Sequence, residues 1–160
     1  MRHGKSSWDD YGLSDHERKL LDIGKEKTKK VADFLKEKGI KPDLILSSTA
    51  TRAHNTSKIV AQILEYPIDE IKTSRDIYHA DDNDIFDALF ALDNSVNSVL
   101  IFGHNPTFTD FVNNFKEIEI DNLPTSGFAA ISFSTDKWEN IPNSKHKFEF
   151  LISPKMLKDK

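Results

Sequence analysis

The stretch Leu44–Arg52, which reads LILSSTATR, joins a short apolar run to the start of a helix. Leu44–Leu46 has the length and composition of a buried strand, which we expect to end at Ser47–Ser48. A helix is expected from about residue 51 to residue 64, with its apolar residues facing inward. A buried strand that leads directly into a helix is typical of a parallel α/β sheet.

The same strand-to-helix pattern occurs again further along the chain. An apolar run at Val96–Phe102 predicts a strand that ends at Gly103–His104, and Thr107–Phe115 predicts the helix that follows. Before the first strand, Ser14–Lys38 predicts a long helix that opens on a Ser14/Glu17 capping box. Its inward face is expected to hold Leu20, Gly24, Thr28, Val31 and Leu35. The other expected elements are an extended segment at 71–78, a short helix at 84–92, and late strands at 128–133 and 148–152.

This alternation of strands and helices predicts the fold class. We expect an α/β fold with three layers, α/β/α, around a mostly parallel central sheet. The two late strands are candidates for an antiparallel pair. The sequence shows no internal repeat or linker, so we expect a single domain over residues 1–160.

Composition excludes several classes of function. The chain of 160 residues has 38% hydrophobic and 30% charged residues, a globular balance, and its net charge of -4 argues against nucleic acid as a partner. It contains no cysteine, which excludes disulfides, thiolate catalysis and cysteine-bound zinc. No apolar run approaches the roughly 20 residues that span a bilayer, and the polar start does not resemble a signal peptide. We therefore expect a cytoplasmic protein without a membrane partner.

Candidate functional residues follow the predicted strands. Arg52 lies at the start of one helix and His104 precedes another, so both are expected at the ligand-binding edge of the sheet. If the opening triplet Arg2-His3-Gly4 also follows a strand, two arginines and two histidines surround one anion-sized space. Each residue alone has an ordinary structural explanation, whereas their common position at strand ends favours an anion site.

These motifs resemble the histidine phosphatase superfamily and, more closely, its small SixA-type phosphohistidine phosphatases. The resemblance rests on Arg2–Gly4, Ser47–Ala53 and Gly103–Pro106, in that order. It implies that His3 attacks phosphorus and forms a covalent phosphohistidine, while Arg2 and Arg52 hold the phosphoryl oxygens. It further implies that His104 donates a hydrogen bond in the transition state, without a metal or other cofactor.

The class of substrate depends on whether the site holds a carboxylic acid that can protonate the leaving group. Many superfamily members that cleave phosphoesters protonate the leaving group with a carboxylic acid in the segment that corresponds to residues 75–82, where His79 takes that place. A site without such an acid suits a phosphorus–nitrogen bond, and hence a phosphorylated protein such as a histidine phosphotransfer domain. Asp81 and Asp82 leave a small phosphoester open as the alternative, and a phosphate-binding module without catalysis is another. The sequence does not distinguish the particular substrate or the oligomeric state.

Further residues are expected around the phosphate. Lys5, Ser6, His79 and Asn105 are candidates for substrate binding, and Asp9 is a candidate for orienting an arginine. The acidic residues Asp81, Asp82 and Asp84 are interpreted as the start of a helix, so no metal site is expected.

The chain departs from the family pattern at its start. Relatives enter the triplet through an apolar strand, whereas only Met1 precedes Arg2 here. We therefore expect a truncated first strand, with a native start upstream of Met1 and an open gap in the core of this chain. The alternative is a rearranged core.

Overall fold

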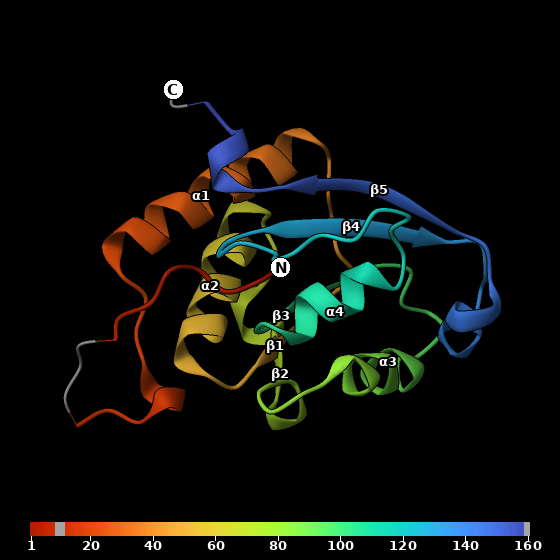
Figure 1. Ribbon diagram of the computed structural model, residues 1–160, viewed down its shortest axis with the longest axis horizontal. Helices are drawn as coiled ribbons and strands as arrows, with labels where there is room; N and C mark the ends of the chain where they lie inside the picture. Colours follow the sequence, from red (N-terminus) through yellow and green to blue (C-terminus); the bar gives the residue numbers. More distant parts are fainter. Residues whose placement is uncertain (9–11, 159–160) are drawn as a thin grey trace.

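A three-stranded parallel sheet forms the centre of the computed structural model, which describes residues 1–8 and 12–158. The order of its strands is β2 (Lys72–Ser74), β1 (Leu44–Ser48) and β3 (Val99–Phe102), and all pairings are parallel (Figure 1). In the register, Leu46 of β1 lies between Lys72 and Ile101. The predicted mostly parallel sheet is thereby confirmed.

The two late strands form a separate antiparallel pair. Strand β4 (Phe128–Phe133) pairs with β5 (His146–Ile152), with an irregularity between Ala130 and Ile131. The expected antiparallel pairing of these strands is confirmed, and the pair lies beside the parallel sheet as a second ladder.

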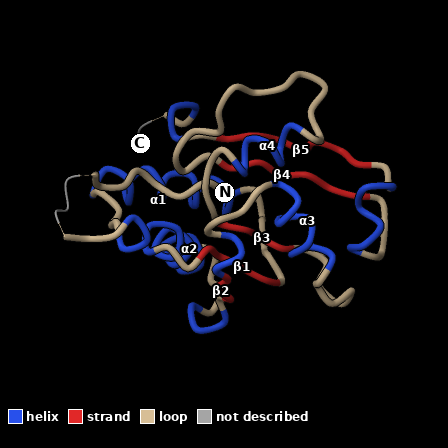
Figure 2. Tube along the Cα trace, turned by 60° about the horizontal axis from the view of Figure 1, so that its bottom comes forward, coloured by secondary structure: helices blue, strands red, loops and turns tan. Residues whose placement is uncertain are grey.

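Helices cover both sides of the strands, as Figures 1 and 2 show. Helices α1 (Asp22–Glu37) and α2 (Thr51–Ile63) lie on one side, and α3 (Asp82–Phe90) and α4 (Thr107–Asn113) lie on the other. Short 3-10 turns occupy Asp15–Glu17, Ile68–Glu70, Arg75–Ile77, Trp138–Asn143 and Pro154–Met156. The predicted three-layer architecture is confirmed. None of the helices among the described residues is both long and apolar enough to cross a membrane.

Successive strand residues point to opposite faces of the sheet, so each face has its own hydrophobic cluster. Ile45 and Phe102, both without exposed surface, pack with buried residues of α1 and α2 such as Leu35. Leu46 and Ile101 face the other way, toward the cluster that contains Phe108 of α4. A strand that is apolar on both faces is expected for a parallel sheet covered by helices.

The predicted long helix begins later than its sequence pattern indicates. The expected capping box is wrong, because the Ser14 hydroxyl donates to the Glu17 carboxylate (2.8 Å) and α1 begins only at Asp22. The intervening chain is held in an extended form, since Leu20 bridges to Ser6 and the Leu21 N–H donates to the Lys5 carbonyl (2.9 Å). This tertiary pairing overrides the local helical pattern and brings the segment against the opening residues.

The opening triplet lies between the parallel sheet and β4. Arg2 forms an isolated parallel bridge with Gly103, and its N–H donates to the Gly127 carbonyl (2.9 Å) just before β4. The His3 N–H donates to the Gly103 carbonyl (3.0 Å), which places His3 directly beside the end of β3. The Met1 carbonyl also accepts a hydrogen bond from the Gly103 N–H (3.2 Å), so the opening residues pair along the end of β3.

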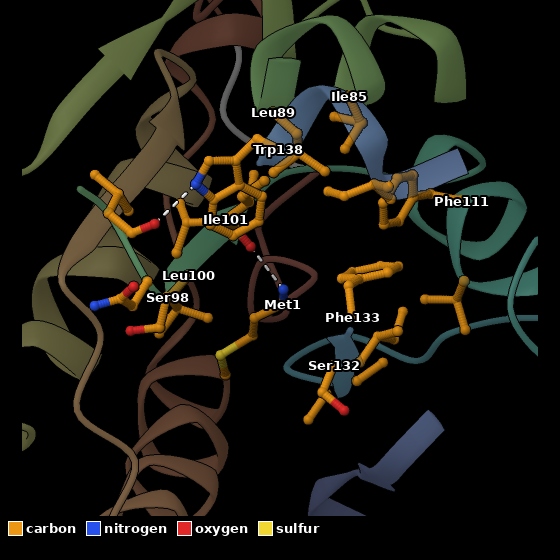
Figure 3. A pocket seen from close by; sticks show the side chains of 18 of the residues that line it. Met1, Ile85, Leu89, Ser98, Leu100, Ile101, Phe111, Ser132, Phe133 and Trp138 are labelled. Carbon is orange, nitrogen blue, oxygen red and sulfur yellow. Dashed lines mark hydrogen bonds between the residues drawn. The ribbon is translucent and has the colours of Figure 1, made fainter. Parts of the chain in front are cut away.

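A cavity of about 450 Å³ adjoins this short pairing, between β3 and β4. Figure 3 shows its largely apolar lining, which includes Leu100, Phe111 and Phe133. At its edge, the Met1 amine donates to the Ile101 carbonyl (2.7 Å).

Candidate active site

The four principal candidate residues come together at the carboxyl ends of the strands. His3 lies beside the end of β3, His104 follows β3, and Arg52 is the second residue of α2 after β1. The ring centroids of His3 and His104 are 5.2 Å apart, and both side chains are buried. Arg52 is buried with them, and its positive charge acts on both imidazoles.

The geometry of His3 sets which of its ring nitrogens carries a proton. Its Nδ1 lies 2.7 Å from the Gly4 carbonyl oxygen, which can only accept a hydrogen bond. Burial lowers the pKa of His3 to about 4, and the positive charges of Arg52 and Arg2 act in the same direction. The hydrogen bond to Gly4 opposes this shift. At neutral pH the ring is thus uncharged, with its hydrogen on Nδ1 and a lone pair on Nε2. A nucleophile needs such a lone pair.

Glycine is required beside this histidine. The Gly4 N–H donates to the Thr56 hydroxyl (3.0 Å), so the backbone lies close to α2. A Cβ at position 4 would come within 2.9 Å of the Thr28 hydroxyl oxygen and 3.1 Å of the Gly24 carbonyl oxygen. The small residue therefore allows the approach that fixes the His3 ring.

In each of the two arginines, some guanidinium nitrogens donate to the protein, while the Nε atom has no partner among the described residues. Arg2 donates through Nη1 to the Leu123 carbonyl (2.9 Å). Arg52 donates through Nη1 to the Asp15 carbonyl (2.6 Å) and through Nη2 to the Asp15 carboxylate (3.1 Å). Within the described part of the chain, the buried Nε atoms of Arg2 and Arg52 have no hydrogen-bond partner. Buried guanidinium donors without a partner are suited to bind an anion.

Asp15 links Arg52 to two further residues that the sequence analysis missed. Its carboxylate accepts hydrogen bonds from Arg18 (2.8 Å) and from the Tyr78 hydroxyl (2.5 Å). The Tyr78 hydrogen bond, together with Arg52 and Arg18, lowers the pKa of Asp15 to about 2, so the group is ionised. Three guanidinium groups and one carboxylate leave the site positive, which suits a phosphate dianion.

No local sequence signal distinguishes these residues. Asp15 and Arg18 lie in a segment with a helical pattern, and Tyr78 follows a polar turn, so only tertiary folding brings them together. Asp9, expected to orient an arginine, lies outside the described residues. Asp15 makes the contact with Arg52 that was anticipated for such an acid.

His104 is oriented by a serine at the end of β1. Its Nε2 lies 2.7 Å from the Ser48 hydroxyl oxygen, and its ring centroid is 5.5 Å from that of Tyr78. Burial is the main cause that lowers the pKa of His104 to about 3, and the electrostatic effects of His3 and Arg52 lower it further. This imidazole is therefore also neutral. Its Nδ1 is buried and, among residues 1–8 and 12–158, lacks a hydrogen-bond partner.

Comparison with known proteins identifies the family. The pattern of the histidine phosphatase superfamily (branch 1) matches residues 1–89, more than half of the chain. The chain belongs to the histidine phosphatase superfamily. This membership supports phosphatase chemistry for the site, in line with the resemblance found in the sequence.

Solved structures of SixA proteins resemble this chain over nearly its whole length. The protein histidine phosphatase SixA in complex with tungstate is 26% identical, with a TM-score of 0.84 over 99% of this chain and 97% of that one. A protein from Agrobacterium tumefaciens assigned as a SixA phosphohistidine phosphatase is also 26% identical, with a TM-score of 0.80 over 96% and 95% of the two chains. The SixA-like fold is thus shown.

A plant relative is more similar in sequence but over a shorter region. An uncharacterised chloroplastic protein of Arabidopsis thaliana is 50% identical over 58 residues, which make up 36% of this chain and 27% of that protein. The chain therefore spans about a quarter of the length of that relative.

The secondary candidates have different surroundings in this superfamily member. Ser6 is buried and accepts a hydrogen bond from Arg18 (2.6 Å), while Lys5 is exposed. His79 is exposed, with its ring 4.2 Å from that of Tyr78. Substrate binding by these three residues stays a prediction.

Asn105 is used to hold the loop after β3. Its amide donates to Asn122 (2.9 Å) and to the Leu123 carbonyl (2.9 Å), and its oxygen accepts from Thr109. Leu123 is also the residue whose carbonyl holds Arg2. Asn105 thus supports the arginine through the loop, and direct substrate binding by it stays a prediction.

The acidic residues considered as proton donors are engaged at the start of α3. Asp81 and Asp84 exchange hydrogen bonds in a capping box, at 3.0 and 2.9 Å. Asp82 accepts from the Asn114 amide (3.2 Å). In the described ranges of the chain, no three His, Asp or Glu side chains are grouped so as to hold a metal ion.

Proposed function

We propose that this histidine phosphatase removes phosphate from a protein histidine through a covalent phosphohistidine on His3. The observation that carries the proposal is the set of three buried nitrogens without a partner among the described residues, Arg2 Nε, Arg52 Nε and His104 Nδ1. These side chains lie around a neutral His3, which supplies the nucleophile. Buried polar groups without partners are rare and are typical of sites that bind a ligand.

In the first step, the lone pair on His3 Nε2 attacks the phosphorus atom. A bond forms between Nε2 and phosphorus, while the bond from phosphorus to the substrate imidazole nitrogen breaks, and the electron pair leaves with the imidazole. The arginine guanidinium groups hold the phosphoryl oxygens, and His104 donates a hydrogen bond to one of them. The Gly4 carbonyl stabilises the positive charge that His3 acquires, because it accepts the Nδ1 hydrogen.

In the second step, water attacks the phosphorus of the phosphohistidine. The new oxygen–phosphorus bond replaces the bond to His3 Nε2, inorganic phosphate leaves, and the water proton passes to phosphate or solvent. His3 returns to its neutral form, with the hydrogen still on Nδ1.

The nature of the leaving group supports a phosphorus–nitrogen substrate. An alkoxide needs a proton as it leaves, whereas an imidazole can be protonated beforehand in solution. Asp15, the carboxylate bound to Arg52, is ionised and has no proton to give. Asp81 and Asp82 are bound at the start of α3, so they would have to leave those contacts to serve a phosphoester.

The SixA comparison supports the same substrate class. One structure similar to this chain is described as a protein histidine phosphatase and holds tungstate, an oxyanion with the shape of phosphate. We propose a phosphorylated protein, such as a histidine phosphotransfer domain, as the partner. The alternatives are a phosphatase of small phosphoesters and a phosphate-binding module without turnover.

Hydrolysis assays distinguish these functions. The chain is incubated with a phosphohistidine protein and separately with an aryl phosphate, and released phosphate is measured. We expect turnover of the phosphohistidine protein, together with an acid-labile phosphate on the enzyme after rapid denaturation.

The variants His3→Ala and His54→Ala provide the test and its control. His54 is a partly buried histidine on α2 and is not one of the proposed site residues. His3→Ala is expected to abolish both turnover and labelling, whereas His54→Ala retains them. Unchanged hydrolysis in His3→Ala would contradict the covalent mechanism, and binding without turnover in the unaltered chain would favour the binding module.

A further inference from the structure

Ser48 is a buried residue at the carboxyl end of β1 that none of the proposed catalytic steps uses. It has no exposed surface. Its hydroxyl oxygen lies 2.7 Å from His104 Nε2 and accepts a hydrogen bond from the Ala50 N–H (3.1 Å). The serine therefore connects the start of α2 to one of the two histidines of the site.

Counting hydrogens limits what this hydroxyl does. A serine hydroxyl has one hydrogen and two lone pairs, and the Ala50 N–H takes one lone pair. A neutral imidazole has one N–H and one lone pair on its ring nitrogens. Two arrangements remain: Ser48 donates to His104 Nε2, or His104 donates through Nε2 to Ser48.

The two arrangements differ in how many buried groups they leave unsatisfied. If His104 Nε2 donates, the Ser48 hydrogen has no other acceptor among the described residues, and the Nδ1 lone pair is also unpaired. If Ser48 donates, only the Nδ1 hydrogen lacks a partner, because Nε2 accepts the serine hydrogen. Since each unsatisfied buried polar group is costly, the second arrangement is the more stable one.

The same arrangement suits a bound phosphate. An Nδ1–H group can donate to a phosphoryl oxygen, whereas an Nδ1 lone pair would repel it. Phosphate would thus satisfy the one group of the Ser48–His104 pair that this arrangement leaves unpaired among the described residues.

We infer that Ser48 is a positioning residue that donates its hydroxyl hydrogen to His104 Nε2, and thereby keeps the proton of His104 on Nδ1, where a phosphoryl oxygen binds. The inference rests on the proposed function for its phosphoryl ligand. The hydrogen bond that one ring nitrogen makes sets the protonation of the other, so Ser48 acts on catalysis through His104 and not by contact with the substrate.

The protonation of His104 is measured directly by NMR. In a ¹⁵N-labelled chain at pH 7, long-range proton–nitrogen correlations show which imidazole nitrogen carries the hydrogen. We expect it on Nδ1 of His104 in the unaltered protein. A hydrogen on Nε2 overturns the inference, whether or not any variant folds.

Ser48→Ala and Ser47→Ala form a matched pair. Ser47 is the preceding residue of β1, also without exposed surface, and its hydroxyl donates to the Ser48 carbonyl (2.9 Å) instead of to a histidine. Ser48→Ala is expected to move the His104 hydrogen at least partly to Nε2 and to weaken tungstate binding. It is also expected to lower kcat/KM for a phosphohistidine protein, on the order of 10- to 100-fold. Ser47→Ala is expected to leave the His104 protonation on Nδ1.

Further outcomes test the role of Ser48 independently of the proposed function. Ser48→Thr retains a hydroxyl, so it is expected to recover tungstate affinity and the Nδ1 hydrogen. Unchanged protonation and unchanged tungstate affinity in folded Ser48→Ala refute the role of Ser48. If the unaltered chain hydrolyses no phosphohistidine, the proposed function fails, while the NMR result still decides how Ser48 and His104 share their hydrogens.

Discussion

Arg52→Lys tests whether the planar guanidinium, and not only its charge, holds the phosphoryl group. In the structure, Arg52 uses Nη1 and Nη2 to contact Asp15 at 2.6 and 3.1 Å, and its Nε is buried without a partner among the described residues. One guanidinium can thus bind Asp15 and a phosphate at once. A lysine ammonium is a single point of charge and cannot span both groups in the same way.

The expected loss follows from the contact that lysine cannot make. A hydrogen bond to a charged group contributes about 1.5–3 kcal/mol, which corresponds to about 10- to 150-fold in kcat/KM. Tungstate affinity is expected to fall as well, because the oxyanion binds the same donor. Both quantities are measured directly, by phosphate release from a phosphohistidine protein and by titration calorimetry with tungstate.

Arg75→Lys makes the same chemical change at a control position. Arg75 is exposed, and its guanidinium carbon lies 5.8 Å from the ring of Tyr78, compared with 6.0 Å for Arg52. We expect Arg75→Lys to retain both activity and tungstate affinity. If Arg52→Lys behaves like Arg75→Lys, the guanidinium fork is not what holds the phosphoryl group, and the reasoning from the unpaired Nε is wrong.

Two further predictions concern stability. Asp15→Asn removes a carboxylate whose pKa is lowered from 3.8 to about 2, and its side chain is 52% exposed, so after solvent screening we expect a loss of about 1 kcal/mol at pH 6. A lowered carboxyl pKa stabilises the fold above pH 3.8, and this contribution disappears as the pH falls toward 2, so the difference from the unaltered protein should shrink at pH 3 in urea unfolding. Phe102→Ala empties a position in β3 with no exposed surface and is expected to cost about 3–5 kcal/mol in the same assay.

Controls for these two variants come from exposed residues of the same types. Asp33→Asn on α1 removes an exposed carboxylate, and Phe90→Ala on α3 removes a ring that is 38% exposed, so each should change the free energy of unfolding less than its buried or ion-paired counterpart. An Asp15→Asn effect of equal size at pH 6 and pH 3 would contradict the ionic role of Asp15. A Phe102→Ala effect as small as that of Phe90→Ala would contradict the placement of Phe102 in the core.

The sequence by itself determined the alternation of strands and helices and the common edge of Arg52 and His104. Both follow from local patterns: apolar runs of strand length, each ending in a polar junction that opens a helix. Because parallel strands end at the same edge, residues 52 positions apart could be assigned to one site without coordinates.

The helix at Ser14–Lys38 shows where local pattern fails. Its first turns have helical spacing, yet Leu20 pairs with Ser6 and keeps the chain extended up to Asp22. Pairing between distant segments outweighs a weak local preference, and this cannot be read from the segment alone.

Only the tertiary structure decided how the site is held and protonated. Asp15 contacts Arg52, and Tyr78 from a separate segment donates to Asp15, while Ser48 at the end of β1 contacts His104 just after the neighbouring strand β3. The hydrogen on His3 Nδ1 depends on a carbonyl 2.7 Å away, and its neutral state depends on burial. Residue types and spacing identify which groups the chain has, but hydrogen bonds and pKa values depend on distance and solvent exposure, which exist only once the chain is folded.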